Sequence, residues 1–371
     1  MRVLFAPDGF GGTLSAVQAA EAMAEGWRRQ APGDALELVP MSDGGPGFVD
    51  VLAGALTGRL VTATVEDPLA RPVPAALLLH GTTAYVESAQ ACGLHLLAAG
   101  ERDPRRTTTY GVGQLLTAAL DAGATRIVVG LGGSATNDGG AGLLAALGLA
   151  RLDAAGERLA PGGAALRQLA GLTGQPDPRL AGVDLVAATD VDAPLLGLHG
   201  ATSVFGPQKG AGREDVLVLD AALERWIDVL EDHLGVRVRD EPGAGAAGGL
   251  GAALLALGAR RESGAALVRD VLGLAERVGD AGLVVTGEGT FDAGSLRGKV
   301  VSGVAALANE HGLPLLVLAG QVRLGRRETA AAGVDAAYAV VDEVGLAAAL
   351  AQPAEQLAAL AARVAREWSR A

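Results

Sequence analysis

Hydrophobic and polar positions alternate regularly along the first part of the chain. The short apolar runs "RVLFAP" and "ALELVP" have the length of buried strands, and each precedes a stretch with the apolar spacing of a helix. These helices are expected over about residues 15–30 and from about residue 47. Alternation of strands and helices is typical of right-handed crossovers onto a parallel sheet. The N-terminal region is therefore predicted to be a doubly wound α/β structure.

The same pattern returns after about residue 280, where "GLVVTGEG", "LPLLVLAG" and "DAAYAVV" read as strands. Between residues 62 and 87, two extended runs broken by prolines and a His-Gly-Thr turn resemble an antiparallel pair instead. The middle of the chain also holds a strand "VDLVAAT" that leads to Asp190, and a long helix over about residues 215–234.

We therefore expect two α/β domains. One is Rossmann- or flavodoxin-like, consists of residues 1–65 plus 280–371, and has a doubly wound, mostly parallel sheet built from both chain ends. The other is an α/β domain inserted as the middle of the chain, residues 66–279.

Composition and charge narrow the class of protein. A chain of 371 residues, 50% hydrophobic and only 3% aromatic, is large enough for two cores and suits helices packed closely on a parallel sheet. The formal net charge of −12, with no basic run, argues against a nucleic-acid partner. The absence of a signal-peptide pattern and of a bilayer-spanning run favours a cytoplasmic protein with no membrane partner. A homodimer is left open.

The stretch "RIVVGLGGSATNDGGAGLLAALG", residues 126–148, leads from a predicted strand into a predicted helix. Glycines let backbone N–H groups converge, and a helix N-terminus adds partial positive charge, so an anion is the natural ligand. A tight turn with an Asx cap is the alternative, but a cap needs one glycine rather than five. We predict a phosphate-binding loop that contains Gly132, Gly133, Ser134, Thr136, Asn137, Asp138, Gly139 and Gly140, with the hydroxyls donating to phosphate and Asn137 and Asp138 capping the helix or approaching a metal.

Acidic residues follow several predicted strands. Because ligands of parallel-sheet proteins bind outside the carboxyl ends of the strands, these acids indicate a shared crevice. Carboxylates gathered there repel one another unless a divalent cation or a proton is present, so magnesium with phosphate is the simplest interpretation. For any single acid, a turn or a helix cap is the alternative. The residues are Asp8, Asp43, Asp190, Asp192, Glu288 and Asp292.

Five basic residues lie in polar loops of small residues and are candidates for binding anions, although each could instead be a solvated surface charge: Lys209, Lys299, Arg297 and the pair Arg105 and Arg106. Lys209 in "FGPQKGAG" and Lys299 in "SLRGKV" could meet a phosphate as point charges. Arg106 and Arg297 could hold a carboxylate through two parallel hydrogen bonds, or be solvated surface charges.

Familiar nucleotide motifs fit poorly. "GAGAAGG" from Gly243 has the dinucleotide-binding spacing but follows "RVRDEP" rather than a strand, which makes a nucleotide-dependent oxidoreductase a weak alternative. Gly298-Lys299 is not a P-loop, because Val300 stands where serine or threonine would bind magnesium. The single cysteine, Cys92, is interpreted as a small buried hydrophobic residue.

Seven segments, in order, resemble the landmark segments of the bacterial type I glycerate kinases over almost the whole chain. They are "APDGFGGTLSA", "SDGGPG", "RTTTYGVG", "GLGGSATNDGGAGLLAALG", "TDVDAPLLGLHGATSVFGPQKGA", "PGAGAAGGLGAALLALGA" and "VVTGEGTFDAGSLRGK". The resemblance implies ATP- and Mg²⁺-dependent phosphorylation of D-glycerate, usually on the 2-hydroxyl, to 2-phosphoglycerate and ADP. It also implies a site in the cleft between two domains.

Roles for the candidate residues follow from this resemblance. Asp190 or Asp192 would orient or deprotonate the glycerate hydroxyl, and Lys209 and Lys299 would contact phosphates. Magnesium would be held by Asp43, Glu288 or Asp292, and the substrate by Asp8, Thr13, Asp43 and Arg106.

The chain departs from the usual family pattern at two positions, where Gly11 replaces a common lysine and Pro46 replaces a common glutamate. A kinase for another small hydroxy acid, and a non-catalytic relative that binds nucleotide without forming ADP, are therefore the alternatives.

Overall fold

The computed structural model describes residues 1–296 and 298–369, so the role predicted for Arg297 lies outside the described residues. The chain divides into two compact units. The first consists of Met1–Asp43, Asp50–Ala55 and Ala265–Ala371, and the second of Gly44–Val49 and Leu56–Gly264. Each unit is described by itself.

The first unit is built on a parallel sheet with the strand order β15-β13-β11-β1-β2. Val3 near the N-terminus lies opposite Leu283, so both ends of the chain share one sheet, as predicted. The order reverses between β1 and β11, which makes their carboxyl ends the switch point of a doubly wound sheet. The strands are β1 (Arg2–Phe5), β2 (Ala35–Leu38), β11 (Leu283–Thr286), β13 (Leu315–Ala319) and β15 (Ala336–Ala339).

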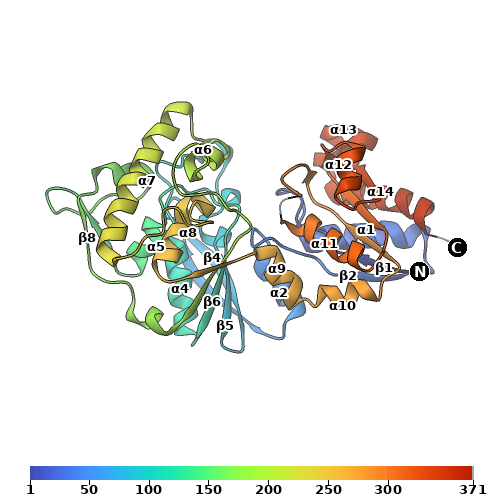
Figure 1. The fold of residues 1–371 in the computed structure, drawn as a ribbon, viewed down its shortest axis with the longest axis horizontal. Coiled ribbons are helices and arrows are strands. Elements are labelled where there is room, and N and C mark those ends of the chain that lie inside the picture. Colours follow the sequence, from blue (N-terminus) through green and yellow to red (C-terminus); the bar gives the residue numbers. More distant parts are fainter. Residues whose placement is uncertain (297, 370–371) are drawn as a thin grey trace. The chain divides into compact units, whose positions relative to one another are not determined.

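Helices cover both faces of this sheet. Val3 and Phe5 point to the face that packs against α1 and α14, which lie side by side (Figure 1). The two helices approach closely because Gly26 has no side chain: a Cβ there would lie 1.9 Å from the carbonyl oxygen of Ala358. A capping box of Ser15 and Gln18 begins α1 at the predicted place.

The other elements of the first unit include α11, which packs on β11 and β13. The helices are α1 (Ala16–Gln30), α10 (Leu274–Gly279), α11 (Val300–Glu310), α12 (Arg326–Ala331), α13 (Val340–Ala351) and α14 (Pro353–Trp368), and a short parallel pair is formed by β12 (Thr290–Phe291) and β14 (Gln321–Val322). Helices α2 (Phe48–Ala55) and α9 (Gly264–Val271) each contain residues of both units.

The second unit has a mixed sheet with the strand order β10-β9-β6-β5-β4-β3. Neighbours from β5 to β10 are parallel, whereas β3, β4 and β5 form an antiparallel meander, which confirms the antiparallel pairing expected between residues 62 and 87. The strands are β3 (Arg59–Glu66), β4 (Pro72–His80), β5 (Thr83–Glu87), β6 (Arg126–Gly130), β9 (Asp184–Ala188) and β10 (Arg260–Glu262), with β7 (Ala150–Leu152) and β8 (Gly171–Thr173) in a separate hairpin.

The units begin and end at different residues from the expected domains 1–65 plus 280–371 and 66–279. Strand β3 belongs wholly to the second unit because it pairs with β4 from Arg59 to Glu66. At the other junction, residues from Ala265 onward already belong to the first unit. Hydrophobic periodicity locates strands but does not show which sheet a strand joins.

The helices of the second unit pack around a core rich in leucine and alanine, with Trp226 of α7 fully buried. Among the helices that the structure describes, none is long and apolar enough to cross a bilayer. The helices of the second unit are α3 (Ala89–Cys92), α4 (Tyr110–Asp121), α5 (Ala141–Ala146), α6 (Ala201–Phe205), α7 (Arg213–Leu234) and α8 (Ala246–Ala256).

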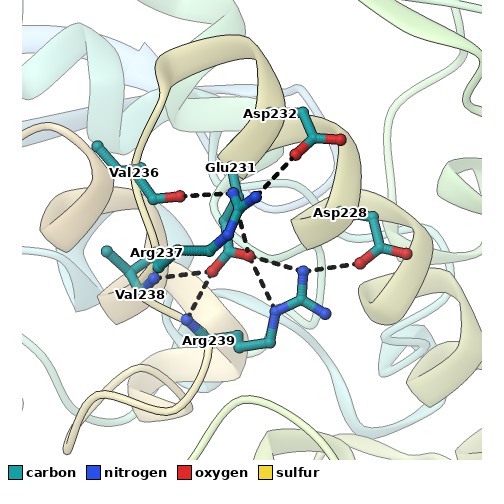
Figure 2. Close-up of polar contacts among 7 residues, drawn as sticks. All are labelled: Asp228, Glu231, Asp232, Val236, Arg237, Val238 and Arg239. Carbon is teal, nitrogen blue, oxygen red and sulfur yellow. Dashed lines mark hydrogen bonds and ion pairs between the residues drawn. The ribbon is translucent and has the colours of Figure 1, made fainter.

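A buried carboxylate anchors the chain that follows α7 (Figure 2). Glu231 is fully buried and accepts hydrogen bonds from the backbone N–H groups of Val238 and Arg239 and from the Arg239 guanidinium, which also pairs with Asp228. Burial by itself raises the pKa of Glu231, but the bonds from Arg239 and the backbone outweigh it and lower the pKa below its ordinary value.

Candidate functional site

The glycine-rich loop follows β6, whose end lies level with the ends of its neighbours in the sheet of the second unit. A Cβ on Gly132 would lie 2.7 Å from the Cα of Gly45, and a Cβ on Gly133 would lie 2.6 Å from the Cγ of Pro46. Such distances are too short for real side chains, so these two glycines allow the segment 44–47 to pass directly over the loop. Pro46, one of the departures from the family pattern, is thus part of this contact.

Asp138 lies two residues before Gly140, the N-cap of α5. Its carboxylate accepts hydrogen bonds from the backbone N–H groups of Thr109, Gly140 and Gly142 and from the Thr109 hydroxyl. The Thr109 hydroxyl in turn accepts from the N–H of Leu143. Of the two roles considered for Asp138, the structure shows the helix cap, and the N–H groups that it holds are engaged within the protein rather than facing a phosphate.

Lys209 lies in the interior, 2% exposed, beside the same loop. Its ammonium group donates hydrogen bonds of 2.9 Å to the hydroxyl oxygen of Ser134 and 2.7 Å to the carbonyl oxygen of Thr136. Burial lowers the pKa of Lys209 to about 8, against the opposing influence of Cys92 and Asp138. The predicted lysine and the predicted loop are therefore brought together, with the lysine directed at the loop.

The rest of the predicted loop is buried as well. Ser134, Thr136 and Asn137 are at most 4% exposed, and the side-chain amide of Asn137 donates to the hydroxyl of Thr202. Gly133 is the exposed residue of the loop, and Gly132 is half-buried. A ligand approaching the loop in this conformation therefore meets the Gly132–Gly133 backbone first.

Asp190 and Asp192 differ in environment, although only one residue separates them. Asp190 follows β9 and accepts a short hydrogen bond from the hydroxyl of Ser263, which follows β10. The Asp192 side chain is 75% exposed and pairs with Arg261. The geometry favours Asp190 over Asp192 as the carboxylate with a positioned oxygen.

Carboxylates gather at the switch point of the sheet in the first unit. Asp8 follows β1, and its backbone N–H donates to the carbonyl oxygen of Gly287 just after β11, next to Glu288. Burial, followed by the charge of Asp43, raises the pKa of Asp8 well above its ordinary value, and burial raises the pKa of Glu288 to about 7. Lys299 lies nearby, with its ammonium nitrogen 3.8 Å from a carboxylate oxygen of Asp43.

The donor set at this edge fits magnesium bound together with a substrate. The Oε1 atom of Glu288 is buried and, among the described residues, lacks a hydrogen-bond partner. Asp292 is engaged in a turn, where its carboxylate accepts from the N–H of Gly294. In the described part of the chain, no group of three histidine, cysteine or acidic side chains is arranged to hold a metal ion. The three predicted ligands Glu288, Asp292 and Asp43 therefore do not form a metal site by themselves. Magnesium is usually held by one or two carboxylates plus phosphate oxygens and water. This cluster can supply the carboxylates, and a bound phosphate would supply the other oxygens.

The remaining predicted residues lie on the surface. Thr13 is exposed, and its hydroxyl donates to the carbonyl oxygen of Phe10. Arg106 is exposed, directly before Thr107, whose hydroxyl donates to the carbonyl oxygen of Ala135.

Two residues that position the candidate groups were missed by the sequence analysis. Thr109, in the quoted "RTTTYG" segment, holds Asp138, and Ser263 holds Asp190. Their signal was weak, because a lone hydroxyl residue after a strand or before a helix is common in any protein.

Comparison with known proteins identifies the family. Residues 3–369 match the glycerate kinase family. The chain belongs to this family. A glycerate kinase from Bacillus subtilis is 44% identical over 345 residues, which cover 92% of this chain and 90% of the relative. The glycerate 2-kinase from Escherichia coli is 42% identical over 353 residues, with 93% and 92% covered.

A solved structure supports the same assignment. The crystal structure of a protein assigned as glycerate kinase 2 from Salmonella typhimurium LT2 is 40% identical to this chain, with a TM-score of 0.78 and coverage of 99% of this chain and 98% of that one. The predicted membership of the glycerate kinase family is confirmed, and with it the prediction of a kinase.

Proposed function

We propose that the protein transfers the γ-phosphoryl group of ATP to the 2-hydroxyl of D-glycerate, with 2-phosphoglycerate and ADP as products. The observation that carries the proposal is the cluster of Asp8, Asp43, Glu288 and Lys299 at the switch point of a doubly wound sheet, in a chain of the glycerate kinase family. Ligands of such sheets bind at this place. The names of the relatives support glycerate as the acceptor, and that of the Escherichia coli relative supports the 2-position.

In the first unit, Glu288 and Asp43 would hold Mg²⁺ together with phosphate oxygens, Asp292 would act through water, and Lys299 would contact a phosphate. The bound ion supplies neutralisation of the charge that spreads over the phosphoryl oxygens. The buried Oε1 atom of Glu288, which has no partner among the described residues, suits this role.

In the second unit, Asp190 would accept the proton of the 2-hydroxyl while the hydroxyl oxygen bonds to phosphorus and the bond from phosphorus to ADP breaks. Ser263 fixes the direction of the Asp190 carboxylate. The Gly132–Gly133 backbone and the Ser134 hydroxyl, oriented by Lys209, would meet the substrate at the end of β6. Asp8 and Arg106 would bind glycerate, whereas Thr13, also expected at the substrate, lines a neighbouring pocket of the first unit.

The test is D-glycerate-dependent release of ADP by the purified protein in the presence of ATP and Mg²⁺. The proposal expects ADP formation with D-glycerate to exceed that with L-glycerate, lactate or glycolate at least tenfold in kcat/KM. A preference for another hydroxy acid would refute D-glycerate as the acceptor but would still support a kinase. Nucleotide binding without ADP formation from any of them would identify a non-catalytic relative.

A further inference from the structure

The first unit contains a pocket beside the carboxylate cluster that the proposed phosphoryl transfer does not by itself explain. Its floor is formed by the loops that follow β1, β11 and β13, at the carboxyl edge of the sheet, and includes Gly11, Gly289 and Gly320. The loops after β11 and β13 are joined by hydrogen bonds from the N–H groups of Gly320 and Gln321 to the carbonyl oxygens of Glu288 and Gly289. A Cβ on Gly320 would lie 2.5 Å from the carbonyl oxygen of Gly289, so the two loops approach closely there. The same loops also contribute Phe10, Thr13, Thr290 and Gln321 to the lining.

The wall of the pocket is apolar. It is formed by residues of α13 and the start of α14, among them Val340, Leu346, Leu350 and Leu357. Leu346 and Leu350 are 53% and 57% exposed, which is unusual for large aliphatic side chains on neighbouring turns of one helix. Removing them from water would be favourable if a flat apolar group lay against them.

The shape of this wall depends on a break in α13. Gly345 has φ 76° and ψ 163°, a conformation that is essentially restricted to glycine. Val340 and Val341 line the pocket from before the break, whereas Leu346 and Leu350 line it from after the break. The N–H of Val341 donates to the carbonyl oxygen of Gly320, which ties the wall to the floor.

The residues of the pocket adjoin those of the carboxylate cluster along the chain. Glu288 immediately precedes Gly289 of the floor, and Asp8 stands two residues before Phe10, which also lines the pocket. A ligand that fills both places has an apolar, flat end and an anionic end bound through a divalent cation. Glycerate carries an oxygen on every carbon and has no such apolar end, whereas a nucleoside triphosphate has both ends.

We propose that this pocket binds the nucleoside of ATP, so that the first unit holds the nucleotide from its base to its phosphates. The inference rests on the proposed function for its ligand. It moves the nucleotide away from the glycine-rich loop, where Asp138 already accepts hydrogen bonds from the N–H groups of Gly140 and Gly142. The glycine at position 11 is then explained locally, because it has φ 50° and open space around it and so adds no side chain to the floor of the pocket.

The test is calorimetric titration of Mg·ADP, and separately of Mg·tripolyphosphate, into the wild type and two variants. Leu350→Asp places a charge on the exposed wall, and Gly345→Ala disturbs the break in α13. Leu217→Asp changes an equally apolar, 75% exposed leucine on α7 and serves as the matched control. Circular dichroism checks that each variant is folded.

We expect Leu350→Asp and Gly345→Ala to raise the Kd of ADP at least tenfold, with the Kd of tripolyphosphate and the KM of D-glycerate changed less than twofold. Leu217→Asp should match the wild type in all three quantities. The proposed nucleoside site would be refuted if folded Leu350→Asp bound ADP with an affinity within twofold of the wild type. It would also be refuted if the wild type did not bind ADP. Loss of ADP affinity in Leu350→Asp, combined with no wild-type turnover of D-glycerate, would support the pocket while refuting the proposed acceptor.

Discussion

The ammonium nitrogen of Lys209 lies 2.9 Å from the hydroxyl oxygen of Ser134, in the interior of the second unit. Burial holds the pKa of this lysine at about 8, below its ordinary value of 10.5. Between these two values the unfolded chain carries the proton and the folded chain does not. Lys209 therefore makes the free energy of unfolding increase as the pH rises above 8. Below pH 8 the folded protein carries the buried charge and its full energetic penalty.

Replacement of Lys209 by methionine removes this dependence. Relative to Lys209→Met, the wild type should gain about 2 kcal/mol in free energy of unfolding between about pH 7.5 and about pH 9.5. Burial raises the pKa of Cys92 to about 12, so this thiol also contributes to the pH dependence, but it is present in both proteins and its contribution cancels in the comparison. Urea unfolding at the two pH values measures the difference, and parallel changes in both proteins would contradict a buried lysine with a lowered pKa.

The cap of α5 by Asp138 predicts a large loss of stability on substitution. Asp138→Asn replaces one carboxylate oxygen, which accepts hydrogen bonds, by an NH₂ group that faces the donors of Thr109, Gly140 and Gly142. Because these donors then lose an acceptor, the free energy of unfolding should fall by about 3 kcal/mol. Asp153→Asn is the control, because Asp153 accepts two backbone N–H groups in an exposed turn, and it should cost less than about 1 kcal/mol. Equal losses in the two variants would show that the loop does not depend on Asp138.

The roles of Asp190 and Asp192 are distinguished by comparing the turnover of two variants. Asp190→Asn should lower kcat about 10²- to 10⁴-fold with an unchanged unfolding midpoint, because a proton acceptor is lost. Asp192→Asn, at an exposed carboxylate paired with Arg261, should leave kcat within about threefold of the wild type. The reverse order of effects would assign the proton transfer to Asp192.

Glu288 is tested through the magnesium dependence of turnover. Glu288→Gln keeps the size of the side chain but removes its charge, and the Mg²⁺ concentration for half-maximal turnover should rise about tenfold or more. Glu276→Gln, at an exposed acid in the first turn of α10, is the control and should not shift the curve. Superimposable curves for all three proteins would remove Glu288 from the metal site.

Sequence patterns predicted the fold well because periodicity and strand ends are local properties. The helix begun by the capping box at Ser15, the antiparallel run before residue 87 and the return of β11 beside β1 all followed from apolar spacing. The position of Asp190 at the end of β9 followed from the same logic.

Contacts between segments distant in sequence could not be predicted. The need for Gly132 and Gly133 arises from Gly45 and Pro46, nearly ninety positions earlier in the chain, and no local pattern reports that approach. Lys209 was expected to contact a phosphate from a polar loop, but its burial and its hydrogen bond to the carbonyl oxygen of Thr136 depend on a segment more than seventy positions earlier in the chain. The pocket beside Leu346 and Leu350 depends on the break at Gly345, which the sequence presents as one more glycine among 55.

The most direct test of the account is the identity of the product. The purified protein is incubated with ATP, Mg²⁺ and D-glycerate, and the phosphorus NMR spectrum is recorded as ADP accumulates. The account predicts the signal of 2-phosphoglycerate in amounts equal to ADP. A spectrum with 3-phosphoglycerate, or with ADP and inorganic phosphate alone, would contradict it.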